Sequence, residues 1–294
     1  MIETIAKIVN RNAFKNNTAF FDILSQYNYA LIKGEALSFY TYGEIGKRVY
    51  GDIDLLLSRK SLHSIEHLLE QFNFKPTVRS RKDKILMLST SHQAAPWIQE
   101  IYPWGHVTID LNIDIFWGEY TGKRIDIDEF LSDCIKIDIY GAQIKILPPV
   151  KTLIHLILHH YKDINSIFLL ATCKSIKYDM FKNVYYLLKN NLDSITIDKL
   201  YAISSEYEVI PYVYYMLYYT GLLFKDEFLE EYITAFKTTQ GEALLNCYGL
   251  NKEERHEWKC DFQTRLENDN LYDLIKDDLT EKDLRKIIIN KKVF

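Results

Sequence analysis

The chain has 294 residues, of which 48% are hydrophobic and 26% charged, and its formal net charge is −4. This length fits one large domain or two medium ones, and the composition is typical of a water-soluble protein with enough apolar residues for a core. The small negative charge argues against sequence-independent binding to long nucleic acid, which needs many cations. It therefore disfavours a DNA polymerase or a DNA-repair enzyme, although a local basic site fits the composition.

Signals of secretion or membrane insertion are missing from the sequence. The four cysteines are far apart and form no C-x-x-C pair, which disfavours a disulfide framework or a zinc knuckle and indicates a reducing compartment. The start, M-I-E-T-I-A-K, lacks the apolar core of a signal peptide. The apolar stretches fall short of the ~20 residues that cross a bilayer. We therefore expect a cytoplasmic protein without a membrane partner.

The first part of the chain predicts helices and then a strand. Residues 1–27 predict two amphipathic helices with a break near Asn16 and Asn17. The apolar run 29–34 ends in glycine and predicts a buried strand, and residues 35–40 predict a short helix.

A loop and an alternation of strands follow. Residues 43–51 contain three glycines and predict a loop, 52–57 predict a second strand, and Ser58 begins an amphipathic helix that ends near Phe72. Further strands are predicted at residues 84–89, 97–102, 106–117, 134–140 and 143–147. Turn-like connections between them favour antiparallel pairing, and the last two strands flank Gly141 as a hairpin.

The composition changes at the double proline Pro148-Pro149, after which Leu, Ile and Tyr recur at helical spacing. We therefore predict an α+β fold: a small mixed, largely antiparallel sheet with flanking helices over residues 1–147, and a helical domain over 148–294. The dense tyrosines of the helical part are interpreted as packing residues of a bundle, with a stacking surface for an aromatic ligand as the alternative.

The stretch G-D-I-D-L-L-L places two acids at the start of an apolar strand. Because side chains alternate along a strand, Asp52 and Asp54 share one face. Two carboxylates ~5 Å apart repel by roughly 3 kcal/mol at an effective dielectric constant near 20. A cation between them relieves this, and Mg²⁺ prefers carboxylate and phosphate oxygens. With Lys47 and Arg48 nearby, a metal–nucleotide site is one interpretation, and a solvated strand edge is the other.

The order of these motifs favours the first interpretation. Lys33-Gly34 ends one strand, R-V-Y-G-D-I-D-L-L begins at Arg48, and I-D-L-N surrounds Asp110. This order resembles the polymerase-beta-type nucleotidyltransferase superfamily and, within it, a bacterial family of uncharacterised nucleotidyltransferases. The resemblance covers residues 29–160 and includes L-I-H-L-I-L-H-H, which is similar to that family's L-x-x-L-x-x-H helix.

The resemblance implies a catalytic site and its ligands. It assigns Asp52, Asp54 and Asp110 as catalytic residues that hold two divalent ions, Mg²⁺ or Mn²⁺. It also implies a nucleoside triphosphate as co-substrate, with ATP as the first choice. The residues expected to contact this nucleotide are Lys33, Gly34, Ser38, Lys47, Arg48 and Gly51. For Lys47 the alternative is a solvated loop cation.

The sequence departs from the family pattern at two places. The usual G-S of the first turn is Gly34-Glu35, and Ser38 stands one helical turn later. The usual D-L-H is Asp110-Leu111-Asn112, and Asp114 shares a face with Asp110, which makes Asp114 the alternative third metal ligand.

Two histidines have a spacing that can hold zinc. His155 and His159 lie four residues apart on a predicted helix. Their neighbours are apolar and the sequence offers no third ligand nearby, so packing or an internal hydrogen bond is the preferred interpretation.

The predicted function is transfer of a nucleoside monophosphate, AMP in the first instance, to a hydroxyl or phosphate of a small molecule, peptide or protein. The helical domain is expected to bind this acceptor. One alternative is a toxin or defence enzyme that modifies tRNA or another cellular target. A second alternative is a protein that binds a nucleotide or a partner without catalysis.

Overall fold

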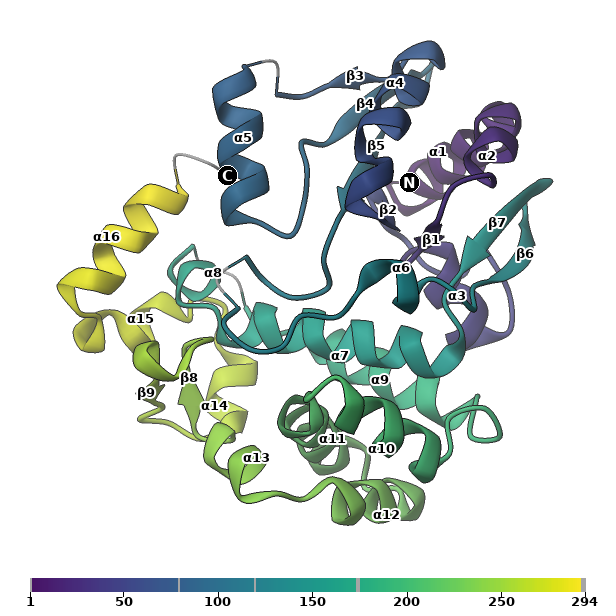
Figure 1. Cartoon of the computed structure of the whole chain (residues 1–294). Coiled ribbons are helices and arrows are strands. Elements are labelled where there is room, and N and C mark those ends of the chain that lie inside the picture. The colour runs from purple at the N-terminus through teal and green to yellow at the C-terminus, as the bar shows by residue number, and fades with distance from the viewer. Residues whose placement is uncertain (1, 79, 119, 173–174, 292–294) are drawn as a thin grey trace. The chain divides into compact units, whose positions relative to one another are not determined.

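The computed structural model describes the chain except residues 1, 79, 119, 173–174 and 292–294. The chain forms two compact units (Figure 1). The α/β unit comprises Met1–Gly118 and Ile125–Thr152, and the helical unit comprises Glu119–Arg124 and Leu153–Phe294. The assignment of residues 1–147 and 148–294 to separate functional domains stays a prediction.

The α/β unit contains the sheet and the helices that flank it. Its elements are α1 (Ile2–Asn16), α2 (Thr18–Leu24), β1 (Tyr29–Leu31), α3 (Glu35–Tyr42), β2 (Asp52–Leu57), the 3₁₀ turn η1 (Arg59–Ser61), α4 (Leu62–Gln71), β3 (Lys75–Pro76), α5 (Arg81–Thr90), β4 (Trp97–Ile101), β5 (Gly105–Asn112), α6 (Ile127–Phe130), β6 (Ile135–Ile139) and β7 (Ala142–Ile146). The predicted α+β class with a largely antiparallel sheet is confirmed.

The sheet has seven strands among the described residues, in the order β3-β4-β5-β2-β1-β7-β6. Four neighbouring pairs are antiparallel, and two are parallel: β2 with β5 and β1 with β7. The central strand β2 lies between β5 and β1, and its residues from Ile53 to Leu57 are buried.

The two N-terminal helices form part of the core beside the sheet. The break predicted near Asn16 and Asn17 is confirmed, because α1 ends at Asn16 and α2 begins at Thr18. The rings of Phe14 and Phe21 stack with their centroids 5.1 Å apart, and both side chains are buried. This aromatic contact holds α1 and α2 together at the break.

The strand predicted at residues 84–89 is wrong, because these residues belong to α5. Its sequence R-K-D-K-I-L-M-L consists mainly of straight-chain residues with good helix propensity, and so short an apolar run does not separate strand from helix. Met87 is buried, and Lys84 Nζ lies 5.6 Å from the ring centroid of Trp97 in β4. Similarly, the strand predicted at residues 106–117 ends at Asn112.

The helical unit is built around tyrosine-rich helices. Its elements are α7 (Pro149–Asn165, which starts in the α/β unit), α8 (Ile167–Ala171), α9 (Tyr178–Lys189), α10 (Ile197–Glu206), α11 (Ile210–Phe224), α12 (Glu227–Phe236), α13 (Thr239–Leu244), β8 (Cys247–Tyr248), η2 (Lys252–Glu254), β9 (His256–Glu257), α14 (Phe262–Glu267), α15 (Tyr272–Ile275), η3 (Lys276–Asp278) and α16 (Glu281–Asn290). Within the described part of the chain, helices are too short or too polar to span a bilayer.

The tyrosines of α11 mostly point into the core of the helical unit. Tyr214, Tyr215 and Tyr219 are buried, and the ring of Tyr219 stacks on Phe262 of α14 with centroids 4.1 Å apart. The guanidinium of Arg265 is also buried and donates to the Tyr219 hydroxyl at 3.0 Å. These contacts fit the interpretation of the tyrosines as packing residues.

Candidate functional site

Two parallel neighbouring strands bring three acids together. In the register of β2 and β5, Asp54 lies opposite Asp110 and Asp52 lies opposite Thr108. Since Asp52 and Asp54 are two residues apart, their side chains leave the same face of the sheet as that of Asp110. One carboxylate oxygen from each of the three residues lies within 4.8 Å of the others. The predicted trio therefore forms one cluster, which we call the acid cluster.

The acid cluster is partly withdrawn from water. Asp54 is 2% exposed, and Asp52 and Asp110 are half-buried. Burial, followed by the carboxylates of Asp54 and Asp52, raises the pKa of Asp110 to about 7. Burial, followed by the charge of Asp54, also raises the pKa of Asp52. The cluster is therefore unfavourable when all three groups are ionised without a cation.

The donor set of the acid cluster fits a divalent cation. Among the described atoms, Asp110 Oδ1 is buried and has no hydrogen-bond partner, an arrangement that costs free energy unless another ligand satisfies the oxygen. Oxygens that share an octahedral Mg²⁺ lie about 3–4 Å apart, so small side-chain movements suffice to bring the three carboxylates to such an ion. Hard oxygen donors of this kind suit Mg²⁺ or Mn²⁺.

Lys33 provides a positive charge beside the cluster. The backbone of Ile32 donates to Asp54 O at 3.1 Å, which extends the β1–β2 pairing by one residue beyond β1. Lys33 follows directly, and its Nζ lies 2.9 Å from Asp54 Oδ1. This ion pair compensates the buried charge of Asp54, which would otherwise be strongly destabilising.

The turn after Lys33 requires a glycine. Gly34 has φ +55°, a conformation that residues with a side chain rarely adopt, and a Cβ atom there would lie 3.1 Å from the ring of Tyr50. The turn leads into α3, whose N-cap is Gly34 itself. The turn at Gly34 is thus packed against the loop that precedes β2, and the predicted contact of Gly34 with a nucleotide stays a prediction.

Ser38 faces that loop from α3. Its side chain is fully buried, donates to the carbonyl oxygen of Glu44 at 2.8 Å, and accepts from the backbone N–H of Lys47 at 3.1 Å. The hydroxyl is therefore engaged with the backbone of the loop, residues 43–51. Its predicted contact with a nucleotide stays a prediction.

The other predicted nucleotide contacts lie in or just after this loop. Lys47 is exposed, and its Nζ lies 3.1 Å from Glu44 Oε2, which is also exposed. Arg48 is half-buried, and Gly51 is exposed directly before Asp52. The loop thus places the positively charged Lys47 and Arg48 a few residues before the start of β2.

Asp114, the alternative third ligand, lies outside the acid cluster. It follows the end of β5 at Asn112, and its Oδ1 accepts a hydrogen bond from the backbone N–H of Phe116 at 3.0 Å. This is the geometry of an Asx turn. The structure therefore brings Asp110, rather than Asp114, to Asp52 and Asp54.

Local sequence patterns do not reveal the contacts of Glu35, which in the sequence is only a departure from the family pattern. Its side chain is 1% exposed and accepts hydrogen bonds from Gly46 N, Tyr50 Oη and Tyr140 Oη. A glutamate at the start of a helix usually indicates a favourable helix-dipole interaction, so no local signal pointed to this buried network.

The helical unit also contains a cluster with metal-ligand atoms, formed by His159, His160 and Asp163 of α7. His159 Nε2 lies 3.3 Å from Asp163 Oδ2, and Lys162 Nζ lies 3.3 Å from Asp163 Oδ1. The ammonium group at this carboxylate competes with a metal ion. The rings of His155 and His159 stack with centroids 6.2 Å apart, so packing and an internal hydrogen bond remain the preferred interpretation.

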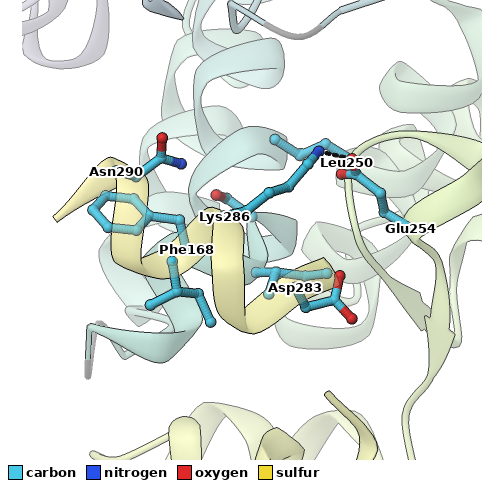
Figure 2. A pocket seen from close by; sticks show the side chains of 9 residues that line it. Phe168, Leu250, Glu254, Asp283, Lys286 and Asn290 are labelled. Carbon is cyan, nitrogen blue, oxygen red and sulfur yellow. Dashed lines mark hydrogen bonds and ion pairs between the residues drawn. The ribbon is translucent and has the colours of Figure 1, made fainter. Parts of the chain in front are cut away.

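A small pocket in the helical unit lies between the start of α8, the turn η2 and α16 (Figure 2). Phe168, Ile287 and Asn290 contribute to its lining, and the ion pair of Lys286 with Glu254 lies at its edge. Its volume is about 40 Å³, which has room for a few water molecules. This pocket is too small for a nucleotide.

Comparison with known proteins identifies the family. A family model described as "Uncharacterised nucleotidyltransferase" matches residues 24–225. The chain belongs to this family. The part of the chain that matches the uncharacterised nucleotidyltransferase family includes the acid cluster, the loop 43–51 and the helices from α7 to α11.

A solved structure gives a weaker comparison. An antigenic nucleotidyltransferase-like protein from Paracoccidioides brasiliensis is 14% identical to this chain, with 71% of this chain and 92% of that chain covered and a TM-score of 0.29. A similarity of this size carries no argument about function. No curated protein matches the chain.

Proposed function

We propose that the protein is a divalent-metal-dependent nucleotidyltransferase. It moves a nucleoside monophosphate, with AMP as the first candidate, from a nucleoside triphosphate to a hydroxyl or phosphate of an acceptor. The observation that carries this proposal is the acid cluster, because three carboxylates from β2 and β5 lie within 4.8 Å in a chain of a nucleotidyltransferase family. A structural role alone does not account for clustered charges that are destabilising without a cation.

The reaction forms one P–O bond and breaks another. The acceptor oxygen attacks the α-phosphorus, the bond from this phosphorus to the bridging oxygen breaks, and pyrophosphate leaves. The acceptor's proton, where it has one, passes to a carboxylate, and Asp110 is the candidate base. When bound, divalent ions supply charge neutralisation of the triphosphate and lower the pKa of an acceptor hydroxyl.

The other residues of the site bind and orient the nucleotide. Asp52 and Asp54 would hold the divalent cations, whose charge would compensate Asp54 in place of the 2.9 Å ion pair with Lys33. Lys33 is then able to turn to a phosphate oxygen. Arg48 and Lys47 are the further candidates for phosphate contacts, since the loop carries them to the start of β2.

The helical unit is proposed to bind the acceptor. The acceptor class that we favour is a small molecule, peptide or protein, because the formal charge of −4 disfavours long nucleic acid. Modification of tRNA stays as the alternative, and a basic surface on the helical unit would favour it.

The test supplies each nucleoside triphosphate with Mg²⁺ to the purified protein in a cell extract. We expect mass spectrometry to find one class of molecule that gains the mass of a nucleoside monophosphate. The Asp54→Asn variant and addition of EDTA should both abolish this gain, because each removes a cation from the site. A protein whose melting temperature does not change with any triphosphate, in Mg²⁺ or Mn²⁺, would contradict the proposed function.

A further inference from the structure

The buried carboxylate of Glu35 joins three segments that are distant in the sequence. Glu35 Oε2 accepts from Gly46 N at 2.5 Å, and Glu35 Oε1 accepts from Tyr50 Oη at 2.9 Å and from Tyr140 Oη at 3.1 Å. Gly46 and Tyr50 belong to the loop 43–51, and Tyr140 lies in the turn between β6 and β7. One side chain of α3 therefore ties the loop to both the helix and the hairpin.

Glu35 and Ser38 act on the same loop from one face of α3. Residues three apart on a helix lie side by side. Ser38 binds the backbone of the loop at Glu44 and Lys47, and Glu35 binds it at Gly46. The carbonyl oxygen of Tyr50, at the end of the loop, accepts a further hydrogen bond from Asn10 at 3.0 Å. The backbone around Lys47 and Arg48 is thus fixed on both sides.

The packing around the network leaves little freedom for another loop conformation. The Tyr50 ring lies against Gly34, where even a Cβ atom would come within 3.1 Å, and a Cβ atom on Gly46 would come within 2.7 Å of Tyr140 Oη. Both glycines have positive φ angles, which suit glycine. Tyr50 and Tyr140 are able to reach the carboxylate of Glu35 because Gly34 and Gly46, against which they pack, have no side chain.

We infer that Glu35 is a positioning residue for the nucleoside triphosphate: it holds the loop 43–51 in the conformation in which Lys47 and Arg48 meet the phosphates. This inference rests on the proposed function. Glu35 does not touch the nucleotide; it acts through the loop backbone and through Tyr50. It takes the place in the turn where the resembled superfamily has a serine, and it holds the phosphate-binding segment from behind.

Replacing Glu35 by glutamine and by alanine tests whether the hydrogen bonds of its side chain are needed, since only glutamine is able to keep them. In Glu35→Gln the amide oxygen is able to accept from Gly46 N, and the amide nitrogen is able to donate to the two tyrosine hydroxyls, which then act as acceptors. Glu35→Ala removes all of these hydrogen bonds. We therefore expect glutamine to retain most of the function and alanine to lose it.

Three measurements test the inference on the full chain. The first is hydrogen exchange of the backbone amides of residues 43–51 without any ligand. The second is the affinity for Mg²⁺ and an ATP analogue with a methylene group between the α- and β-phosphorus atoms. The third is Mn²⁺ binding followed by electron paramagnetic resonance. For Glu35→Ala we expect roughly tenfold faster exchange in the loop and roughly tenfold weaker binding of the analogue, with Mn²⁺ affinity close to that of the wild type.

A matched pair of tyrosine variants provides the control. Tyr50→Phe removes a hydroxyl that donates to Glu35. Tyr40→Phe removes a hydroxyl from α3, the helix that carries Glu35, and this hydroxyl donates to Leu147 O at 2.8 Å instead. We expect Tyr50→Phe to accelerate exchange in the loop and weaken analogue binding by a few-fold, and Tyr40→Phe to change neither. If Glu35→Ala does not fold, these two tyrosine variants alone test the positioning role of Glu35.

The outcomes of these experiments are distinguishable. Loop exchange and analogue affinity that are unchanged in folded Glu35→Ala, or equal in the two tyrosine variants, overturn the role of Glu35. A wild-type protein that binds no analogue contradicts the proposed function instead, and loop exchange alone then decides whether Glu35 positions the loop. Loss of Mn²⁺ binding in Glu35→Ala also overturns the inference, because it indicates general damage to the site.

Discussion

At Asp110 the folded chain keeps a carboxylate where its charge is unfavourable. Burial and the neighbouring carboxylates of Asp52 and Asp54 raise its pKa to about 7, and Oδ1 has no hydrogen-bond partner among the described atoms. Replacement by a neutral amide of the same shape should therefore help the metal-free protein and harm the metal-bound one. Such opposite effects distinguish a ligand from a packing residue.

We predict that Asp110→Asn raises the free energy of unfolding of the metal-free protein at pH 8 by roughly 1 kcal/mol, because it removes repulsion between carboxylates. Because the pKa of Asp110 is higher in the folded than in the unfolded state, this carboxyl destabilises the folded wild type increasingly as pH rises from about 4 to about 7. The stability gain of Asp110→Asn should therefore vanish below pH 4. Urea denaturation in EDTA at several pH values measures this.

The same variant should lose the stabilisation that Mg²⁺ gives to the wild type. Asp114→Asn is the matched control, since asparagine retains an oxygen that is able to accept from Phe116 N. We expect it to keep the response to Mg²⁺. A normal response in Asp110→Asn together with a lost one in Asp114→Asn would show that the third ligand has been assigned to the wrong residue.

Single residues of the site differ in how far the sequence reveals them. Asp52 and Asp54 are predictable because a strand places alternate residues on one face, a rule that needs no tertiary information. Asp114 satisfied the same rule until the strand ended at Asn112. The environment of Ser38 depends on the fold of the following loop, and that of Glu35 on Tyr140, which is 105 residues away; neither is visible in local patterns.

At the scale of elements, the turn between β1 and α3 determines how closely the loop approaches the helix. Gly34 has φ 55° and ψ −115°, and its Cα lies against the Tyr50 ring. Gly43 at the other end of α3 also has a positive φ, of 71°, but a Cβ atom there would meet nothing within 4 Å. The two glycines thus differ in packing while both have unusual backbone conformations.

We predict that Gly34→Ala lowers the free energy of unfolding by about 2 kcal/mol or more, because backbone strain and contact with Tyr50 add. Gly43→Ala should cost about 1 kcal/mol from the left-handed conformation alone. Urea denaturation of both variants gives the difference. Equal losses would mean that the Tyr50 ring moves freely and does not constrain the turn.

The elements that the sequence predicted well have strong local signals. Residues 52–57 form β2 as expected, the hairpin around Gly141 is formed by β6 and β7, and the double proline leads into α7 at Pro149. The strand prediction for residues 84–89 is wrong because so short an apolar run fits a strand or a helix equally, and its residues have good helix propensity. Tertiary packing against Trp97 then selects the helix.

At the scale of the whole molecule, the sheet order combines pairings that local patterns do not encode. The pairs β4–β5 and β6–β7 are antiparallel as predicted, but the strands that form the acid cluster pair in parallel, across some fifty residues of intervening chain. Turn residues indicate only where neighbouring strands in the sequence meet. The family resemblance implied that Asp52, Asp54 and Asp110 share one site, but it did not predict the parallel pairing of their strands.

We predict that a nucleotide protects the α/β unit selectively. With Mg²⁺ and the methylene analogue of ATP, hydrogen exchange should slow in residues 29–57 and 105–112, because binding stabilises the segments that hold the ligand. The helices α9 to α13 should change only when the acceptor is added. Protection confined to the helical unit would contradict the assignment of the nucleotide to the acid cluster.

The hydrogen bonds of Glu35 also bear on the order in which parts of the protein become structured during its synthesis. A ribosome completes the acidic strands long before it reaches Tyr140 and β7, the strand that pairs with β1. Contacts between such distant positions form late because chain closure over long distances is entropically costly. A growing chain therefore already carries Asp52, Asp54 and Asp110 while the loop 43–51 is still loosely held, and this loop becomes fixed only with the final hairpin of the α/β unit.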